Sequence, residues 1–206
     1  MPATFNKSIA LAMTGASGAQ YGLRLMEALL NANCQVQLMI SKPGQVVINM
    51  ETALKLPGQT QAIADYFSKR YNAAEGQLRV YGQDQWTAPV ASGSGFPDAM
   101  VICPCTMGSL SAVANGGSRN LIERAADVAI KEQRKLIIVP RETPLSAIHL
   151  ENMLKLSRLG VMILPANPGF YNQPDTLNDL VDFVVARLLD QLGVEHELLP
   201  PWGGKK

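Results

Sequence analysis

Short apolar segments of strand length alternate with amphipathic segments of helix length over nearly the whole chain, and this alternation constrains the fold most. Strands are expected at residues 9–14, 36–40, 98–103, 136–139 and 161–164, with a short extended piece at 78–80. Helices are expected at residues 19–33, 45–56, 61–71, 107–114, 121–132, 146–159 and 177–192. Near-continuous apolar strands joined by helical crossovers predict an α/β fold, a parallel sheet with helices on both faces.

The chain is expected to form a single domain over residues 1–206, because this length is ordinary for one domain and no internal repeat divides it. Two stretches fit no regular element. Residues 81–97 are rich in Gly, Ser and Pro and are expected to form a long loop of the kind that often carries function. Residues 195–206 place Leu198 and Trp202 among prolines, so this tail is expected to pack on a neighbouring subunit.

Composition and charge exclude several classes of protein. The net charge is +1, so the chain lacks the basic excess with which general nucleic-acid or anionic-membrane binders hold their targets. Three cysteines and two distant histidines provide neither a disulfide framework nor a zinc site, and no metal is expected. No run of about 18 apolar residues suggests a membrane span. The first apolar segment is too short for a secretory signal, and a cytoplasmic location is expected.

The segment Leu-Ile-Ile-Val-Pro-Arg-Glu-Thr-Pro at 136–144 carries the strongest indication of a site. A buried strand runs directly into Arg141 and Glu142, which lie between two prolines. In open α/β sheets, ligands bind at the carboxyl ends of the strands. An adjacent Arg–Glu pair there is costly to desolvate and hard to explain as packing. The pair predicts a site that binds an anion and moves a proton.

Three further turns follow predicted strands at the same edge. Thr-Gly-Ala-Ser-Gly at 14–18 opens the first helix, whose N-terminus offers free N–H groups and a partial positive charge to a phosphate or a flavin oxygen. Ser41 follows the second strand, and Thr-Met-Gly-Ser at 106–109 follows the strand after the long loop. The spacing matches neither the dinucleotide-binding nor the P-loop motif. The alternatives are a glycine turn without a ligand and a simple helix cap at Ser41.

Several other charged or polar residues have two open interpretations. Arg124 and Lys131 lie seven apart on one predicted helix face, which equally fits a solvated, salt-bridged surface. Arg187 lies in an apolar part of the last helix and therefore needs an anionic partner. Tyr171 either contacts a ligand or belongs to the core. Glu51 is favoured as a surface charge on the second helix.

Three residue groups that resemble reactive motifs are favoured as structural. Asp179 and Asp182 have the spacing of a magnesium-binding pair but lie on an ordinary amphipathic helix, so a solvated face is expected. Cys103 and Cys105 have apolar neighbours and no second pair, which favours buried structural thiols. His149, at a helix start between apolar residues, is interpreted as structural.

Motifs spread over almost the whole chain match one family of flavoproteins. They are MTGASGA at 13–19, SK at 41–42, Trp86 with ASGS at 91–94, CPC at 103–105, NLIERAADV at 120–128, PRETP at 140–144, HLENM at 149–153, PGFY at 168–171 and PWG at 201–203. On these motifs the chain resembles the UbiX-type flavin prenyltransferases, once described as aromatic-acid carboxy-lyases. The P-R-E-x-P and N-L-I-x-R-A-A-D-V runs are the most specific.

The resemblance implies a flavodoxin-like fold and a dodecamer built of trimers, with sites at subunit interfaces. Reduced FMN would lie across the strand ends, and dimethylallyl phosphate would be the second substrate. The positions that match flavin-binding residues are Gly15, Ala16, Ser17, Ser41, Thr106, Met107, Gly108, Ser109 and Arg141. The positions that would hold the phosphate, some from adjacent subunits, are Ser92, Arg124, Lys131, Tyr171 and Arg187.

The chemistry that the resemblance implies agrees with these residue types. Charge builds on the phosphate as the allylic C–O bond breaks, so fixed cations are needed, and Lys and Arg supply them without magnesium. The flavin N5 would attack the dimethylallyl carbon, and its C6 would close a new ring with proton transfer. A tryptophan, Trp86 or Trp202, would face the allyl cation. The expected catalytic residues are Ser17, Glu51, Lys131, Glu142 and Trp202. The product, prenylated FMN, would serve a UbiD-type decarboxylase in ubiquinone or aromatic-acid metabolism.

Two other functions stay open on the residues alone, and a third is disfavoured. A flavin-dependent decarboxylase would use the same cations to bind a carboxylate. A non-catalytic FMN carrier would bind flavin without needing Glu142 or Lys131. A nicotinamide reductase is disfavoured because the short-chain reductase turn T-G-x-x-x-G-x-G and a Y-x-x-x-K pair are absent from the sequence.

Overall fold

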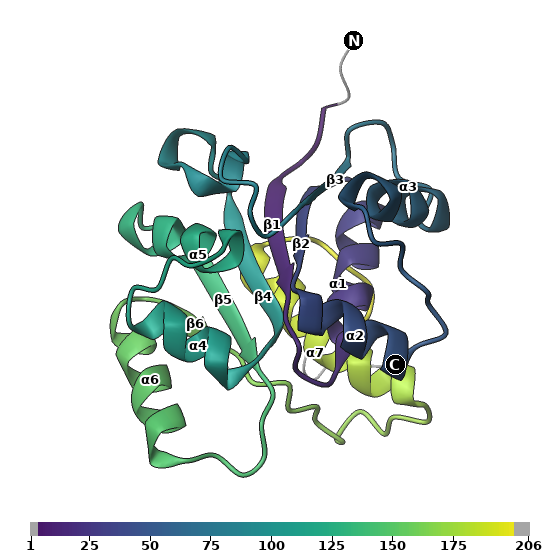
Figure 1. Cartoon of the computed structure of the whole chain (residues 1–206). Helices are drawn as coiled ribbons and strands as arrows, with labels where there is room; N and C mark the ends of the chain where they lie inside the picture. Colours follow the sequence, from purple (N-terminus) through teal and green to yellow (C-terminus); the bar gives the residue numbers. More distant parts are fainter. Residues whose placement is uncertain (1–3, 200–206) are drawn as a thin grey trace.

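The computed structural model describes residues 4–199, which form a six-stranded parallel sheet covered by helices on both faces (Figure 1). The strands are β1 (Ser8–Met13), β2 (Gln35–Ile40), β3 (Leu78–Tyr81), β4 (Ala99–Cys105), β5 (Lys135–Pro140) and β6 (Met162–Ile163), in the order β3-β2-β1-β4-β5-β6. Without β3, which extends the sheet beyond β2, this is the 2-1-3-4-5 order of flavodoxin-like folds. The predicted fold class is confirmed.

The helices are α1 (Ala19–Asn31), α2 (Lys42–Glu51), α3 (Thr60–Arg70), α4 (Met107–Ala114), α5 (Leu121–Lys131), α6 (Ala147–Arg158) and α7 (Leu177–Leu192). Alternate β1 residues point to opposite faces, as strand geometry requires. Ile9 and Leu11 pack in a core with α1, α3 and α7, whereas Ala10 and Ala12 pack in a second core with α4 and α5. Burial on both faces explains why the strands lack polar alternation.

The sequence pattern placed α4 and α7 at their observed bounds but misplaced α2, which was expected at residues 45–56. Ser41 caps the helix by accepting a hydrogen bond from the Gly44 backbone N–H at 2.9 Å, and Pro43 lies in the first turn. Both features favour a helix start. At the end of α1, Asn33 has a φ of 56°, so the helix stops at Asn31 rather than at residue 33.

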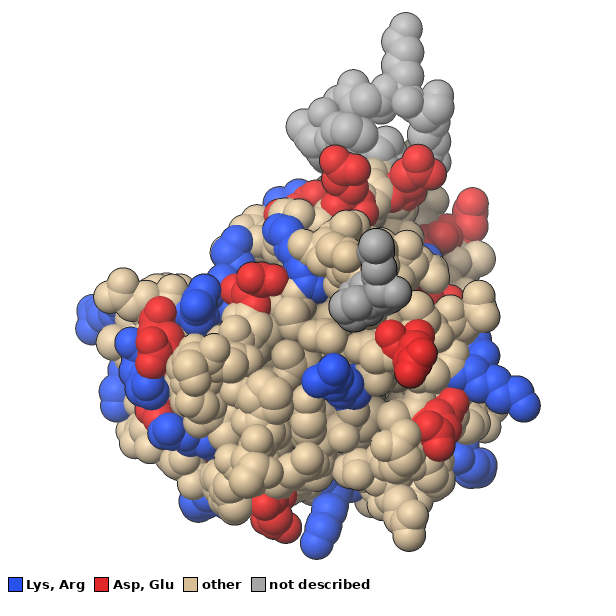
Figure 2. Space-filling model, turned by 90° about the horizontal axis from the view of Figure 1, so that it is seen from above, with Lys and Arg blue, Asp and Glu red and all other residues tan. Residues whose placement is uncertain are grey.

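The expected loop at residues 81–97 contains two short 3-10 turns, Pro89–Ala91 and Gly93–Gly95. Within residues 4–199, the helices are too short or too polar to cross a bilayer. Figure 2 looks down on the end of the molecule from which β1 begins, and it shows Lys and Arg side chains interspersed with Asp and Glu. Neither sign of charge dominates that face.

Candidate functional site at the carboxyl edge of the sheet

The carboxyl ends of the strands meet at one edge of the sheet, the lower edge in Figure 1, because all neighbouring strands are parallel. β1 lies between β2 and β4, so the connections from β1 and β4 diverge to opposite sides. Open α/β sheets bind ligands at such a switch point. Residues 14–18, Ser41, residues 106–109 and Arg141 all lie at this edge. The structure thus brings together the flavin-binding positions implied by the resemblance.

Thr14 joins two of these turns. Its hydroxyl donates to the Pro104 carbonyl at 2.9 Å and accepts from the Thr106 backbone N–H at 2.8 Å. Thr14 is 3% exposed, so these hydrogen bonds are shielded from water. They fix the start of α4 against the end of β1. Thr14 was not among the predicted site residues, although its place between a strand and a glycine turn was a usable signal.

Replacing Thr14 with valine is expected to weaken FMN binding by about tenfold, because a buried N–H loses its acceptor and the two turns separate. Thr14→Ser keeps the hydroxyl and is the matched control. Flavin fluorescence titration measures both dissociation constants. Equal affinities in the two variants would show that the hydroxyl does not organise the edge.

Gly15 permits the turn after β1 to contact the turn after β2. A Cβ at Gly15 would lie 2.5 Å from the Pro43 Cβ, a distance that no relaxed contact allows. Ser41 joins the same contact, since its backbone N–H donates to the Met13 carbonyl at 2.9 Å. The glycine is therefore required by close approach of the two turns.

The first N–H groups of α1 were expected to be free, but Glu51 accepts hydrogen bonds from two of them. One carboxylate oxygen of Glu51 accepts from the Gly18 and Ala19 backbone N–H groups, both at 2.9 Å. Gly18, with a φ of 103°, turns the chain into the helix. Glu51, favoured as a surface charge, is partly buried and neutralises the helix N-terminus. A ligand at this turn must contact Gly15, Ala16 or Ser17 instead.

Two opposing effects act on the pKa of Glu51. Partial burial raises it, but hydrogen bonds from the Ser17 side chain and from the backbone of Ala19 and Gly18 outweigh burial. The positive charge of Arg141 acts in the same direction as these hydrogen bonds. The pKa of Glu51 therefore lies below the ordinary value, and the residue is a carboxylate near neutral pH.

Replacing Glu51 with glutamine is expected to lower the free energy of unfolding at pH 7 by about 1 kcal/mol. A carboxylate whose pKa is lower in the folded than in the unfolded state stabilises above the unfolded pKa, and loses that contribution as pH falls through the folded pKa. The difference between wild type and Glu51→Gln should thus shrink below about pH 4.5. Urea unfolding at several pH values measures it. A difference independent of pH would contradict the charge argument.

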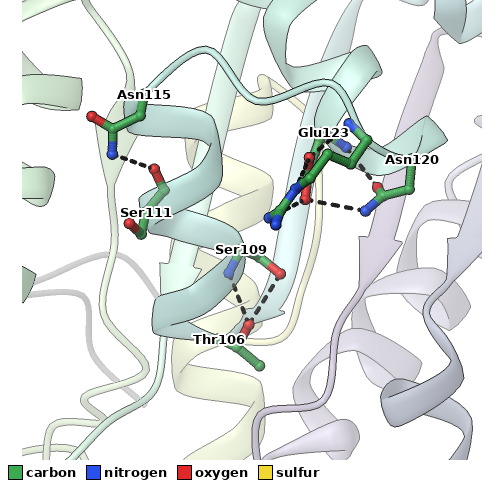
Figure 3. A network of polar contacts seen from close by, with 7 residues as sticks. Thr106, Ser109, Ser111, Asn115, Asn120 and Glu123 are labelled. Atoms are coloured by element: carbon green, nitrogen blue, oxygen red, sulfur yellow. Dashed lines mark hydrogen bonds and ion pairs between the residues drawn. The ribbon is translucent and has the colours of Figure 1, made fainter.

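The start of α4 presents two hydroxyl groups (Figure 3). Thr106 is the N-cap: its Oγ1 accepts from the Ser109 backbone N–H at 3.1 Å and donates to the Ser109 Oγ at 3.0 Å. Met107 is 7% exposed and packs in the second core, so its side chain is structural and its backbone faces the edge. Hydroxyls at a helix N-terminus form a familiar phosphate site.

Arg141 and Glu142 follow β5 as predicted, but both are exposed in the single chain. Desolvation of the pair, which the sequence argument assumed, does not occur within one protomer. The Nε of Arg141 donates to the Ser17 carbonyl at 3.3 Å, whereas Glu142 accepts from the Thr143 backbone N–H at 3.1 Å. Both residues line a cavity of about 610 Å³ together with Leu150. Glu142 is thus an exposed carboxylate at the site edge.

Ser92, Arg124 and Lys131 form a second group. Arg124 donates from Nε to the Ala91 carbonyl at 3.1 Å, which holds α5 beside the 3-10 turns. Lys131 pairs with Glu132 at the end of α5, shortly before β5 begins. In Figure 1 these turns lie at the upper left, far from the lower edge where β1 and β4 end. One protomer therefore does not bring this group to Arg141.

Tyr171 and Arg187 form a third group, on α7 and the segment before it. The Tyr171 ring packs edge-on against Phe183, with centroids 5.5 Å apart. Arg187 has the anionic partner that was predicted, Asp190 at 2.8 Å, but it is 54% exposed rather than embedded in apolar surroundings. Both line a cavity of about 1030 Å³ with residues that follow α7.

The residues favoured as structural have packing or capping roles. Asp182 pairs with Arg24 at 2.6 Å and joins α7 to α1, so the prediction that it lies on a solvated face was wrong. Burial raises the pKa of Cys105 to about 12, which makes its thiol inert. His149 completes the cap of α6 with Ser146. Within residues 4–199, His, Cys, Asp and Glu form no group of three or more that could hold a metal ion.

The expected C-terminal tail is described only as far as Leu199. Leu198 packs against the main core of its own chain rather than extending outward. Trp202, expected to contribute to the site, lies outside the described residues. His196 hydrogen-bonds Asp190 at 3.1 Å, a contact that sequence analysis missed because the two residues carry no motif.

The chain as a whole is similar to proteins of one family. The Flavoprotein family model matches residues 3–189. The chain is 60% identical to the flavin prenyltransferase UbiX of Pseudomonas aeruginosa, covering 95% of this chain and 93% of that protein. It is 50% identical to the flavin prenyltransferase UbiX of Halalkalibacterium halodurans, covering 94% and 92%.

Two solved structures show the same fold. One is AnUbiX (PadA1) in complex with FMN and dimethylallyl pyrophosphate, with a TM-score of 0.85, 38% identity and coverage of 97% of this chain and 99% of that one. The other is a dodecameric FMN-dependent UbiX-like decarboxylase from Escherichia coli O157:H7, with a TM-score of 0.81, 41% identity and coverage of 92% and 96%. The chain therefore belongs to the UbiX family of flavin prenyltransferases.

Proposed function

We propose that this flavin prenyltransferase holds reduced FMN across the carboxyl edge of β1, β2, β4 and β5, and holds a dimethylallyl phosphate beside it between protomers. One observation carries the proposal: the turns after these four strands meet at the switch point, and Arg141 is tied to Ser17 there. Reduced FMN supplies a nucleophilic N5 and the C6 that closes the ring.

The residues at this edge fit a flavin mononucleotide. Gly15 lets the turn after β1 pack directly against Pro43, which fixes the backbone of residues 15–17 at the edge where the flavin is proposed to lie. Thr106 and Ser109 offer hydroxyls at the start of α4, which suits a phosphate. Arg141 adds a cation. The proposed flavin contacts are Gly15, Ala16, Ser17, Ser41, Thr106, Met107, Gly108, Ser109 and Arg141.

The donor phosphate is proposed to lie where protomers meet, because one protomer cannot complete its site. Among the described residues that line the Tyr171 cavity, Arg187 is the only Lys or Arg, against the carboxylates of Asp190, Glu195 and Glu197. An anion bound there needs further cations. Ser92, Arg124 and Lys131 of a neighbouring copy would supply them. The dodecameric E. coli relative supports such an assembly.

Each proposed catalytic residue has a separate task. Lys131, with the arginines, stabilises the charge that develops on the departing phosphate. Glu142, exposed at the site edge, carries the proton lost on ring closure. Glu51, held as a carboxylate, orients Ser17 toward the reacting nitrogen. Trp202 faces the allyl cation.

We further propose that the protein works in the cytoplasm and delivers prenylated FMN to a UbiD-type decarboxylase, as in ubiquinone synthesis. Cys34, Cys103 and Cys105 are all free thiols and all buried, a cysteine usage typical of a reducing compartment.

Anaerobic incubation with FMN, a reductant and dimethylallyl monophosphate is expected to yield a flavin heavier by one C5 unit in mass spectrometry. A parallel reaction with the diphosphate tests which donor is used. Glu142→Ala and Lys131→Ala should bind FMN but form little adduct, whereas a mere carrier would be indifferent to both changes. Release of CO₂ from an aromatic acid by this protein alone, without any adduct, would instead favour a direct decarboxylase, the activity in the description of the E. coli relative.

A further inference from the structure

We propose that His196 is a positioning residue for Arg187: through Asp190, it fixes the guanidinium that takes the phosphate of the prenyl donor. The inference rests on the proposed function, in which Arg187 binds that phosphate. It assigns a role to two residues, Asp190 and His196, that carry none in the mechanism described above.

The three side chains form a chain of hydrogen bonds. Arg187 donates from Nη1 to Oδ2 of Asp190 at 2.8 Å, one turn further along α7. The other carboxylate oxygen, Oδ1, lies 3.1 Å from Nε2 of His196. Asp190 therefore uses both oxygens, one toward each partner. Because a guanidinium has five N–H groups, the bond to Asp190 leaves others for an anion.

The backbone determines which ring nitrogen of His196 carries the proton. The Leu198 backbone N–H donates to Nδ1 of His196 at 3.3 Å, so Nδ1 is an acceptor. In a neutral imidazole the proton is then on Nε2, which donates to Asp190. His196 thus contacts the carboxylate through Nε2.

The exposed fractions of the three side chains show which end of this hydrogen-bonded row is anchored. They are 12% for His196, 44% for Asp190 and 54% for Arg187. His196 lies between Val194, which is buried, and Leu198, which packs on the main core. The exposed arginine is therefore restrained by a fixed residue. Such restraint lowers the rotamer entropy that a long side chain loses on binding a ligand.

The surroundings of Arg187 make its orientation matter. Tyr171, Arg187, Asp190 and His196 line the same cavity of about 1030 Å³, and the carboxylates of Glu195 and Glu197 also line it. A phosphate that enters meets these negative charges. Because its second oxygen is bound to His196, Asp190 contacts the guanidinium through one oxygen only, and the other N–H groups of Arg187 remain for the phosphate.

The test is anaerobic steady-state kinetics with excess FMN, a reductant and dimethylallyl phosphate as the varied substrate. His196→Ala is expected to raise the donor KM about tenfold, the equivalent of one lost hydrogen bond, with kcat within about twofold and FMN affinity unchanged. His196→Gln, whose amide N–H can replace Nε2, should restore the donor KM. His149→Ala, which changes the other histidine at the cap of α6, is the matched control and should leave it unchanged.

The effect must pass through Arg187, so the His196 variants are repeated in an Arg187→Ala background. There His196→Ala should have no further effect on the donor KM. If it costs the same tenfold factor, His196 acts through the fold and the proposal is wrong. If Arg187→Ala raises the donor KM but His196→Ala does not, the proposal alone fails. If Arg187→Ala leaves the donor KM unchanged, the phosphate role of Arg187 fails, and the proposal with it.

Discussion

Replacing Arg141 with alanine is expected to lower kcat/KM for prenyl transfer by about 100-fold and to weaken FMN binding by about tenfold. Arg141 is the cation at the carboxyl end of β5, it binds the Ser17 carbonyl, and its charge helps to keep Glu51 ionised. Its loss removes charge stabilisation and loosens the turn that would contact the flavin. Kinetics of adduct formation and flavin titration measure the two effects separately.

Arg141→Lys separates charge from geometry. Lysine keeps the positive charge but lacks the planar fork that donates from Nε, so intermediate activity is expected. Because Arg141 is exposed, neither variant should change the thermal unfolding temperature by more than a degree or two. Wild-type activity in Arg141→Ala would remove Arg141 from the proposed site.

The positions of the site turns were predictable because they depend on local pattern. An apolar strand followed by a glycine, hydroxyl or charged turn predicts a ligand at the sheet edge, and parallel strands bring such turns together. Residues 14–18 and Arg141 lie 123 or more positions apart in the chain, yet the strand pattern alone places them at one edge. The predicted fold class succeeded for the same reason.

The contacts between turns were not predictable, because they depend on the register of helices that the pattern left loose. Glu51 reaches the start of α1 as the last residue of α2, whereas a helix over residues 45–56 would have placed Glu51 in its middle. Thr14 binds Pro104, and the two are distant in sequence. A polar residue at a strand end therefore indicates a site without revealing its partner.

The proposed phosphate-binding positions lie on two separate surfaces and Arg141 lies on a third, and this distribution has a physical reason. A single chain that gathered Arg124, Lys131, Arg141 and Arg187 in one place would have to hold several cations together without an anion. That repulsion costs stability at the short distances and reduced dielectric of a protein site. A protomer that keeps them apart avoids this cost, and in the proposed assembly the bound phosphate would offset the repulsion between cations of neighbouring protomers. The proposed interface site is consistent with this distribution.

Gly22→Ala is expected to lower the free energy of unfolding by about 2–3 kcal/mol, although alanine is the better helix former by about 1 kcal/mol. Gly22 lies inside α1, where a Cβ would be 2.3 Å from the Cys103 carbonyl oxygen and 2.7 Å from Cε of Met13. The methionine can move, but a backbone oxygen in the central strand β4 cannot. α1 must therefore shift away from the sheet, and the Ser17 turn that begins it must shift as well.

Gly58→Ala is the matched control, because a Cβ at Gly58 would meet nothing within 4 Å and its φ is not positive. Urea unfolding should leave that variant within about 0.5 kcal/mol of wild type. Gly22→Ala should lose FMN affinity along with stability. Close packing of α1 on β4 holds in place residues 15–17, the turn that is proposed to contact the flavin. A Gly22→Ala variant more stable than wild type would mean that helix propensity outweighs the contact, and that α1 can be displaced without disturbing the site.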